Sequence, residues 1–411
     1  MIKKAVKYNC IENLKKDGNP IIIVAAVREA EAIKYACDEK GITVSAFCDT
    51  EKRKTIDKFC GLEVIHTPNL KSRYPKARFI IASQHILDVS DQLSGMGYDE
   101  IYSALEILKT YNVYNKDYLI SQSYMDSRVS VYKKTHEFYF DENKNYMRSL
   151  DIMVTTKCSL KCKNCSNLMQ YYKNPNNTSH EEILNALKVI DKAVDEISEY
   201  RIIGGEPMMN KDWANIVKSI IEMKPGRRIF IYTNGTIPPR DEQLNFFQGH
   251  KVNFIITDYG KLSKNISKLV EKLDEHNLTY VRTPPENWID CSSLRHHKRS
   301  VKDLTEVFKQ CCVKYVYTLL DGKLYRCPFI ANADNLNAIP DNPANYVDLF
   351  SKNEDTSKRI KLLINNRKFF PACDFCDGRP YDPSSKLGYD GVGMITPARQ
   401  TPAPLSYKEY K

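Results

Sequence analysis

Apolar runs alternate with amphipathic stretches in the first hundred residues. The run PIIIVAA (20–26) is continuously apolar, which is typical of a strand buried on both faces of a parallel sheet. REAEAIKYACDEKG (28–41) follows with helical periodicity and ends at a glycine, a helix stop signal. Further strands are expected at ITVSAFCD (42–49), RFIIAS (78–83) and DEIYSAL (99–105). This order predicts a Rossmann-like α/β domain over residues 1–110.

The first strand-to-helix turn of this domain, residues 25–30, contains no glycine. Dinucleotide-binding folds place glycines there, because side chains would crowd a pyrophosphate. We therefore do not expect nicotinamide or flavin binding. Asp49 ends the second strand, where a ribose-binding acid or an ordinary turn residue would both fit, and we favour the turn residue.

A second α/β series begins after residues 111–147, which lack a clean period and are expected to connect two domains. Ser179 and Glu182 form a capping box that predicts a helix start. Because strands and helices alternate, we expect a partial parallel (β/α)6 barrel over 148–300, with its functional loops at the carboxyl ends of the strands. The expected strands are LDIMVTT (150–156), YRIIGGEP (200–207), RRIFIYTNGT (227–236), VNFIITDYG (252–260) and TYVRTP (279–284).

Composition narrows the class of protein. The chain of 411 residues has a net charge of +10, but its basic residues are interleaved with acids and carry no nucleic-acid signature. The sequence shows no membrane-spanning run and no signal peptide, so we expect a cytoplasmic protein without membrane or nucleic-acid partners. Thirteen cysteines in a reducing compartment favour metal or redox chemistry over disulfides.

Three of these cysteines lie in the loop after the first barrel strand, within TTKCSLKCKNCSN (155–167). They are Cys158, Cys162 and Cys165. Thiolates suit zinc or iron–sulfur clusters, and three thiolates on a four-iron cluster leave one iron open to a small molecule. A zinc site completed by a distant fourth ligand is the alternative.

The loop resembles the CxxxCxxC signature of the radical SAM superfamily. That resemblance implies a [4Fe–4S] cluster, S-adenosyl-L-methionine (SAM) as cofactor, and an external electron donor such as flavodoxin or ferredoxin. In the superfamily, reductive cleavage of SAM releases a 5′-deoxyadenosyl radical that abstracts a hydrogen atom from the substrate. One position departs from the family pattern: Asn164 stands where an aromatic residue usually lies near the adenine.

The resemblance also implies cofactor contacts at the ends of the next strands. GGEP resembles the family's GGE segment, whose acid binds the methionine amino group. YTNGT resembles a segment expected to reach the ribose or carboxylate, and TDYG ends the fourth strand, where the alternative is a simple turn. The residues concerned are Gly204, Gly205, Glu206, Pro207, Thr233, Asn234 and Asp258.

A second cysteine group resembles the twitch domain, the shortened SPASM extension, and implies an auxiliary [4Fe–4S] cluster in residues 301–411. Asp321-Gly322 predicts a hairpin that brings the flanking cysteines together. We prefer Cys312 over Cys311 as the first ligand, and a zinc ribbon is the alternative. The expected ligands are Cys312, Cys327, Cys373 and Cys376.

The expected activity is that of a radical SAM enzyme acting on a small molecule, a carbohydrate or cyclitol that is nucleotide-linked or free, by epimerisation or dehydrogenation. Cys291 is a candidate hydrogen-atom donor for epimerisation, although structural packing is the more ordinary role. RHHKR (295–299) suits either a phosphate clamp or, as we favour, a solvated loop. Modification of a ribosomally made peptide and a non-catalytic zinc-stabilised binding protein are the alternatives.

Overall fold

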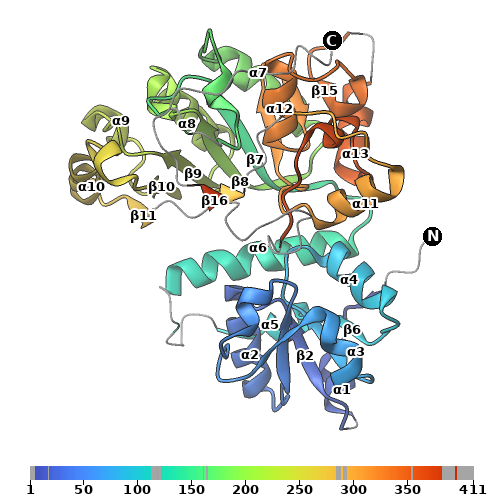
Figure 1. Ribbon diagram of the computed structural model, residues 1–411. Helices are drawn as coiled ribbons and strands as arrows, with labels where there is room; N and C mark the ends of the chain where they lie inside the picture. Colours follow the sequence, from blue (N-terminus) through green and yellow to red (C-terminus); the bar gives the residue numbers. More distant parts are fainter. Residues whose placement is uncertain are drawn as a thin grey trace. The chain divides into compact units, whose positions relative to one another are not determined.

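The computed structural model describes residues 5–16, 18–112, 118, 122–160, 162, 165–283, 288–289, 294–352, 355–381 and 394–395. The chain forms two compact units, residues 1–144 and 145–411 (Figure 1). Both units are built around parallel sheets, so the predicted α/β class is confirmed. No helix among the described residues is long and apolar enough to cross a membrane.

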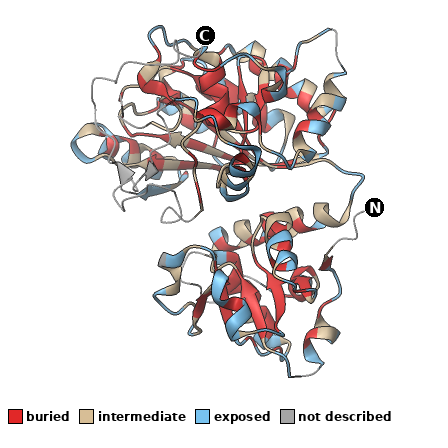
Figure 2. Cartoon of the chain, turned by 45° about the vertical axis from the view of Figure 1, so that its right-hand side comes forward, coloured by how far each residue is buried: buried red, intermediate tan, exposed pale blue. Residues whose placement is uncertain are grey.

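The first unit is a sheet of six parallel strands in the order β1-β6-β5-β2-β3-β4. The expected strands and the helix after the first of them are present, and β1 and β4 are additions that are too short to show a period. The residues of β2, β3, β5 and β6 are buried throughout, and Figure 2 colours them red. The elements are β1 (Val6–Lys7), α1 (Ile11–Lys15), β2 (Ile21–Val24), α2 (Arg28–Glu39), β3 (Ala46–Asp49), β4 (Val64–His66), α3 (Leu70–Arg73), β5 (Arg78–Ile81), α4 (Ile86–Gly95), β6 (Ile101–Ser103), α5 (Leu105–Leu108) and α6 (Gln122–Phe140).

Helix α6, in the segment expected to be a connection, belongs to the first unit and packs at the carboxyl edge of its sheet. The Tyr132 hydroxyl donates a 2.8 Å hydrogen bond to the carbonyl of Ile81, where β5 ends. His136 Nδ1 lies 2.8 Å from the hydroxyl of Ser103, where β6 ends. Doubly wound sheets bind ligands at this edge. Here side chains of the protein itself occupy the ends of β5 and β6.

Asp49 holds turns together at the same edge. Its carboxylate accepts 2.9 Å hydrogen bonds from the main-chain N–H groups of Ala26 and Glu51. These contacts correspond to the turn role favoured from the sequence.

The second unit contains an eight-stranded sheet in the order β11-β10-β9-β8-β7-β13-β14-β15. Strands β7 to β11 are parallel and correspond to the five expected barrel strands. The elements are β7 (Tyr146–Thr155), α7 (His180–Asp191), β8 (Glu196–Gly204), α8 (Trp213–Met223), β9 (Arg228–Thr233), α9 (Asp241–Asn245), β10 (Val252–Thr257), α10 (Ile266–Glu275), β11 (Thr279–Thr283), β12 (Trp288–Ile289), α11 (Val301–Gln310), β13 (Tyr317–Leu320), β14 (Lys323–Tyr325), α12 (Pro328–Asn335), β15 (Tyr346–Asp348), α13 (Thr356–Asn365) and β16 (Met394–Ile395).

The second cysteine region continues the barrel sheet. Strand β13 pairs in parallel with β7, and β14 and β15 add antiparallel strands beyond it. Asp321 and Gly322 form the predicted hairpin turn, with φ angles of 45° and 69°. Ser179 is the N-cap of α7, as expected, because its hydroxyl accepts a hydrogen bond from the N–H of Glu182. Strands of the two cysteine regions thus belong to one sheet.

Candidate active site

The three cysteines of the first group lie in the loop that follows β7. All three thiols are buried enough for desolvation to raise their pKa values, and the pKa of Cys162 reaches about 12. Cys158 and Cys162 both interact electrostatically with Cys165, so the loop brings the three thiols close together. A bound cation would offset the burial penalty by favouring the thiolates. Asn164 lies outside the described residues.

The two glycines of GGEP fit against this cysteine loop. A Cβ atom on Gly205 would lie 2.1 Å from the carbonyl oxygen of Lys157 and 2.7 Å from the Cβ of Cys158. The N–H of Glu206 donates a 2.8 Å hydrogen bond to the same Lys157 oxygen. Glycine lets two backbone segments approach each other closely. Here Gly205 approaches the backbone of the cysteine loop, whereas a Cβ on Gly204 would meet the Thr155 carbonyl at the end of β7.

Glu206 is fully buried beneath the ends of β8 and β9. Its carboxylate accepts hydrogen bonds from the Thr233 hydroxyl at 2.9 Å and from the N–H of Asn234 at 2.8 Å. Desolvation raises the pKa of Glu206 to about 7, and the hydrogen bonds partly counteract this shift. The acid therefore joins the GGEP and YTNG segments. Pro207, which follows it, opens a short 3₁₀ turn over Pro207–Met209.

Asn234 connects the end of β9 to the first cysteine. Its amide nitrogen lies 3.8 Å from Cys158 Sγ and 3.1 Å from the hydroxyl of Ser159. The residues predicted as SAM contacts at the ends of β8 and β9 thus surround the start of the cysteine loop. A hydrogen bond to a cysteine sulfur is one of the means by which proteins tune iron–sulfur clusters.

Asp258 and Tyr259 follow the end of β10, and their surroundings differ. The Asp258 carboxylate receives hydrogen bonds from Arg282 Nε at 3.0 Å and Nη2 at 2.7 Å, which lower its pKa. Tyr259 interacts electrostatically with all three cysteines of the first group, and burial is the main reason that its pKa is raised. Tyr259 was not predicted as a site residue, and its only signal in the sequence was an aromatic side chain beside the predicted contact.

The second cysteine group is assembled by the hairpin and by a short backbone pairing. The N–H of Cys312 donates a 2.8 Å hydrogen bond to Arg379 O, and Cys311 forms an isolated bridge with Pro380. Cys311 interacts electrostatically with Cys327 and Cys373. Neighbouring residues of an extended segment point to opposite sides, so Cys311 is a candidate first ligand beside the Cys312 preferred from the sequence.

The donor set fits a sulfur-ligated cluster. Backbone N–H groups point at three sulfurs: Ile330 N lies 3.4 Å from Cys327 Sγ, Phe370 N 3.4 Å from Cys373 Sγ, and Gly378 N 3.3 Å from Cys376 Sγ. N–H donors stabilise thiolates, and hydrogen bonds to the sulfurs tune cluster potentials.

In the part of the chain that the structure describes, no three His, Cys, Asp or Glu side chains surround a single metal position. Four thiolates suit either zinc or an iron–sulfur cluster, so the zinc alternative stays open for the second cysteine group.

Arg379 interacts electrostatically with cysteines of both groups. Its positive charge lowers the pKa of Cys165 in the first group and the pKa values of Cys311 and Cys327 in the second, against the larger effect of burial. One guanidinium therefore acts on thiols of both groups.

The sheet face opposite the buried Leu150 and Ile152 row carries paired charges. Asp151 and Arg201 are adjacent in the β7–β8 register, and their side chains form a bidentate pair at 2.7 and 3.1 Å. The Arg201 guanidinium lies 5.3 Å from the ring centre of Tyr232 on β9. Desolvation raises the pKa of Asp151 to about 6, although Arg201 opposes that shift.

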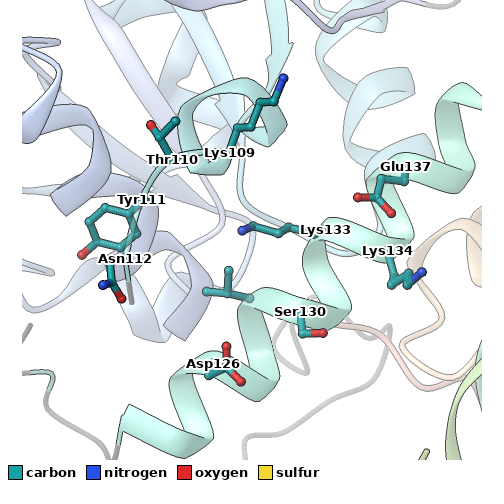
Figure 3. Close-up of a pocket in the computed structure, with 10 residues that line it drawn as sticks. Lys109, Thr110, Tyr111, Asn112, Asp126, Ser130, Lys133, Lys134 and Glu137 are labelled. Atoms are coloured by element: carbon teal, nitrogen blue, oxygen red, sulfur yellow. The ribbon is translucent and has the colours of Figure 1, made fainter. Parts of the chain in front are cut away.

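Cys291, the predicted hydrogen-atom donor, falls outside the described residues. A pocket of about 510 Å³ lies in the first unit, between the segment after α5 and helix α6 (Figure 3). It contains none of the predicted site residues. Its lining combines lysines and acids with small polar side chains: Lys109, Thr110, Tyr111, Asn112, Asp126, Val129, Ser130, Lys133, Lys134 and Glu137.

Part of the second unit is similar to known proteins. Residues 152–278 match the family described as the Radical SAM superfamily. GTP 3′,8-cyclase of Campylobacter jejuni subsp. doylei is 35% identical over 99 residues, which are 23% of this chain and 29% of that protein. The enzyme of the same name from Alkaliphilus metalliredigens is 32% identical over 103 residues, 24% of this chain and 30% of that protein. The chain thus spans under a third of the length of these relatives.

Two solved structures were also found to be similar to parts of the chain. BtrN, crystallised with AdoMet and 2-DOIA, covers 61% of this chain and 100% of its own, at 14% identity and a TM-score of 0.36. Streptococcus suis SuiB bound to S-adenosylmethionine covers 62% of this chain and 59% of its own, at 15% identity and a TM-score of 0.29.

Proposed function

We propose that this chain, which belongs to the radical SAM superfamily through residues 152–278, abstracts a hydrogen atom from a carbohydrate or cyclitol and thereby epimerises or dehydrogenates it. The superfamily uses a [4Fe–4S] cluster and SAM. The observation that carries the proposal is the convergence of Cys158 with Glu206 and Asn234 at the carboxyl ends of β7, β8 and β9.

Two sets of cysteines would hold two clusters. Cys158, Cys162 and Cys165 would hold the first and leave one iron open for SAM. Cys311, Cys327, Cys373 and Cys376 would hold an auxiliary cluster. The first cluster, when bound and reduced by a partner such as flavodoxin or ferredoxin, supplies the electron that cleaves SAM to methionine and a 5′-deoxyadenosyl radical.

The protein's own residues would bind and orient the cofactor. Glu206 joins the two loops that flank the methionine end, and main-chain groups of Gly204 and Gly205 would face the ammonium. Tyr259 lies beside the three cysteines and would supply the aromatic surface for adenine that position 164 lacks. Asp258 would contact the cofactor from the loop after β10, where hydrogen bonds from Arg282 lower its pKa.

A polar substrate is favoured by the face of the sheet that carries Asp151, Arg201 and Tyr232. Their charges and hydroxyl can hydrogen-bond to a molecule rich in hydroxyls and orient it. A buried charge pair carries a desolvation cost, and binding such a substrate would account for its presence. This face gives the carbohydrate proposal its support over the alternative of a ribosomally made peptide.

Relatives named GTP 3′,8-cyclase favour a second candidate substrate, a nucleotide. A nucleotide-linked sugar would satisfy both proposals. The alignment that supports the nucleotide as substrate covers 29% of the Campylobacter protein.

The test is anaerobic reconstitution followed by turnover with SAM and dithionite. We expect 5′-deoxyadenosine to form faster with one class of substrate among free aminocyclitols, nucleotide-sugars and GTP. Running the reaction in D₂O separates the outcomes: an epimerase incorporates deuterium from solvent, whereas a dehydrogenase forms a ketone. Absence of both iron and 5′-deoxyadenosine would overturn the proposal, and activity on GTP alone would select the second candidate.

A further inference from the structure

The basic segment at residues 295–299 packs against the turn that carries Cys373 and Cys376. The N–H of His297 donates a 3.0 Å hydrogen bond to the carbonyl of Asp374. Two residues later, the N–H of Arg299 donates a 3.1 Å hydrogen bond to the Asp374 carboxylate. The segment therefore runs along the cysteine turn through its backbone, while Arg295, His296 and Lys298 are exposed, as expected of the solvated loop favoured from the sequence.

Side chains of the same segment add further contacts to the turn. His296 Nε2 lies 3.0 Å from Asp374 Oδ2, and its ring stacks on Phe375 with the ring centres 4.8 Å apart. His297 Nε2 lies 3.1 Å from Asp377 Oδ1. The acids that follow the two cysteines are thus both engaged by this one basic segment.

Arg299 makes the contacts that bear directly on the cysteines. Its Nη1 donates to the carbonyl oxygens of Cys376 at 2.9 Å and of Cys373 at 3.4 Å. The side chain is 16% exposed, so these bonds are largely shielded from water. One nitrogen therefore bridges the two main-chain carbonyls of the CxxC turn. A lysine would keep the positive charge but would lose the planar fork of donors.

We infer that Arg299 is a positioning residue that holds the Cys373–Cys376 turn in the conformation that binds the auxiliary metal group. The inference rests on the proposed auxiliary cluster and goes beyond it, because it assigns that site a determinant about 75 residues away in sequence, as the separation of the bonded pair indicates. Without Arg299 the turn keeps its cysteines but loses the bridge between their carbonyls.

Anaerobic metal analysis of three full-length variants tests this role. Arg299→Gln removes the charge and the fork, Arg299→Lys keeps the charge, and Lys298→Gln changes an exposed neighbouring cation as the control. The unmodified protein and the control should hold about eight irons, two clusters of four. Arg299→Gln should fall toward about four irons and lose substrate turnover, while it still cleaves SAM to 5′-deoxyadenosine. Arg299→Lys should lie between them.

Two readouts separate positioning from general stability. The paramagnetic signal of the SAM-binding cluster should be unchanged in Arg299→Gln, and the melting temperature should match the control. Any auxiliary cluster that remains should have a more negative midpoint potential, because a cation near Cys373 has been removed. Full iron content with an unchanged auxiliary signal and potential would overturn the inference.

Failure of the proposed function would look different. In that case the unmodified protein itself would hold about four irons, or zinc in the second cysteine group. The same three variants then decide the role of Arg299 through zinc content: loss of zinc in Arg299→Gln but not in Lys298→Gln supports it, and equal zinc contents overturn it.

Discussion

The fully buried carboxylate of Glu206 accepts a 2.8 Å hydrogen bond from the main-chain N–H of Asn234, and this bond joins the loops after β8 and β9. Asn234 in turn reaches Cys158 Sγ. A change at Glu206 is therefore transmitted to the first cysteine through one intervening residue, even without direct contact between Glu206 and a cofactor.

Glu206→Gln should weaken SAM binding. The donors at Thr233, Asn234 and Met208 all face the carboxylate, so the amide group of glutamine would meet one of them donor to donor. Loss of one hydrogen bond to a charged group corresponds to roughly a 10- to 100-fold increase in the Kd for SAM. Calorimetry on the reconstituted protein measures it. Thr233→Val, which removes a single donor, should cost less, and an unchanged Kd in Glu206→Gln would refute the linking role.

Gly205→Ala should displace the cysteine loop. The added methyl group would lie 2.1 Å from the Lys157 carbonyl, a backbone atom that cannot rotate away. We expect the SAM-binding cluster to be lost, with roughly half of the iron remaining, as measured by iron analysis and by the SAM-dependent change in its paramagnetic signal. Gly95→Ala is the control, because an added Cβ there meets nothing within 4 Å. A variant with both clusters intact would contradict the steric argument.

The choice between the adjacent cysteines is tested by two serine variants. Cys311→Ser should lose the auxiliary cluster, about four irons, because Cys311 is the thiol that interacts with Cys327 and Cys373. Cys312→Ser should retain it, since the main chain of Cys312 supplies the bond to Arg379. Each variant is the matched control for the other. The reverse result would restore the ligand preferred from the sequence.

Short-range patterns in the sequence predicted most of the fold. Apolar runs located β2, β7 and β9, and the Ser179 cap and the Asp321-Gly322 turn located a helix start and a hairpin. Such signals are visible because they depend on neighbours in sequence. The pairing of β13 with β7 joins residues more than 160 positions apart, such as Leu150 and Tyr317, and no local pattern encodes it.

The candidate site was predictable as a set of residues but not as a set of contacts. Cysteine spacing located the two groups, whereas the choice between Cys311 and Cys312 depends on which side of an extended segment each occupies. The GGEP segment was singled out as a cofactor contact, but that Gly205 packs against the backbone of the cysteine loop was not predictable from its spacing. Tyr259 and Arg299 carried no distinguishing spacing, because their roles arise from loops that meet only in three dimensions.

The stability of the first unit should depend on pH through His136. The imidazole is fully buried between Ser103 and Ser83, and desolvation lowers its pKa from 6.5 to about 4. Between these values the unfolded chain binds a proton that the folded unit does not, so acidification favours unfolding. The neutral His136 thus contributes about 3 kcal/mol to the free energy of unfolding of the first unit. This contribution is fully present above pH 6.5 and is lost as the pH falls to about 4.

Hydrogen exchange of β6 and α6 in the full-length protein measures this dependence once intrinsic exchange rates are subtracted. The protection of these elements should decline between pH 6.5 and pH 4, the range set by the pKa of His136. His136→Gln cannot titrate, so its protection should be lower at neutral pH but flatter across that range. His66→Gln, in the same unit at a more exposed ring, should behave like the unmodified protein. Equal slopes in all three proteins would show that another group governs the acid response.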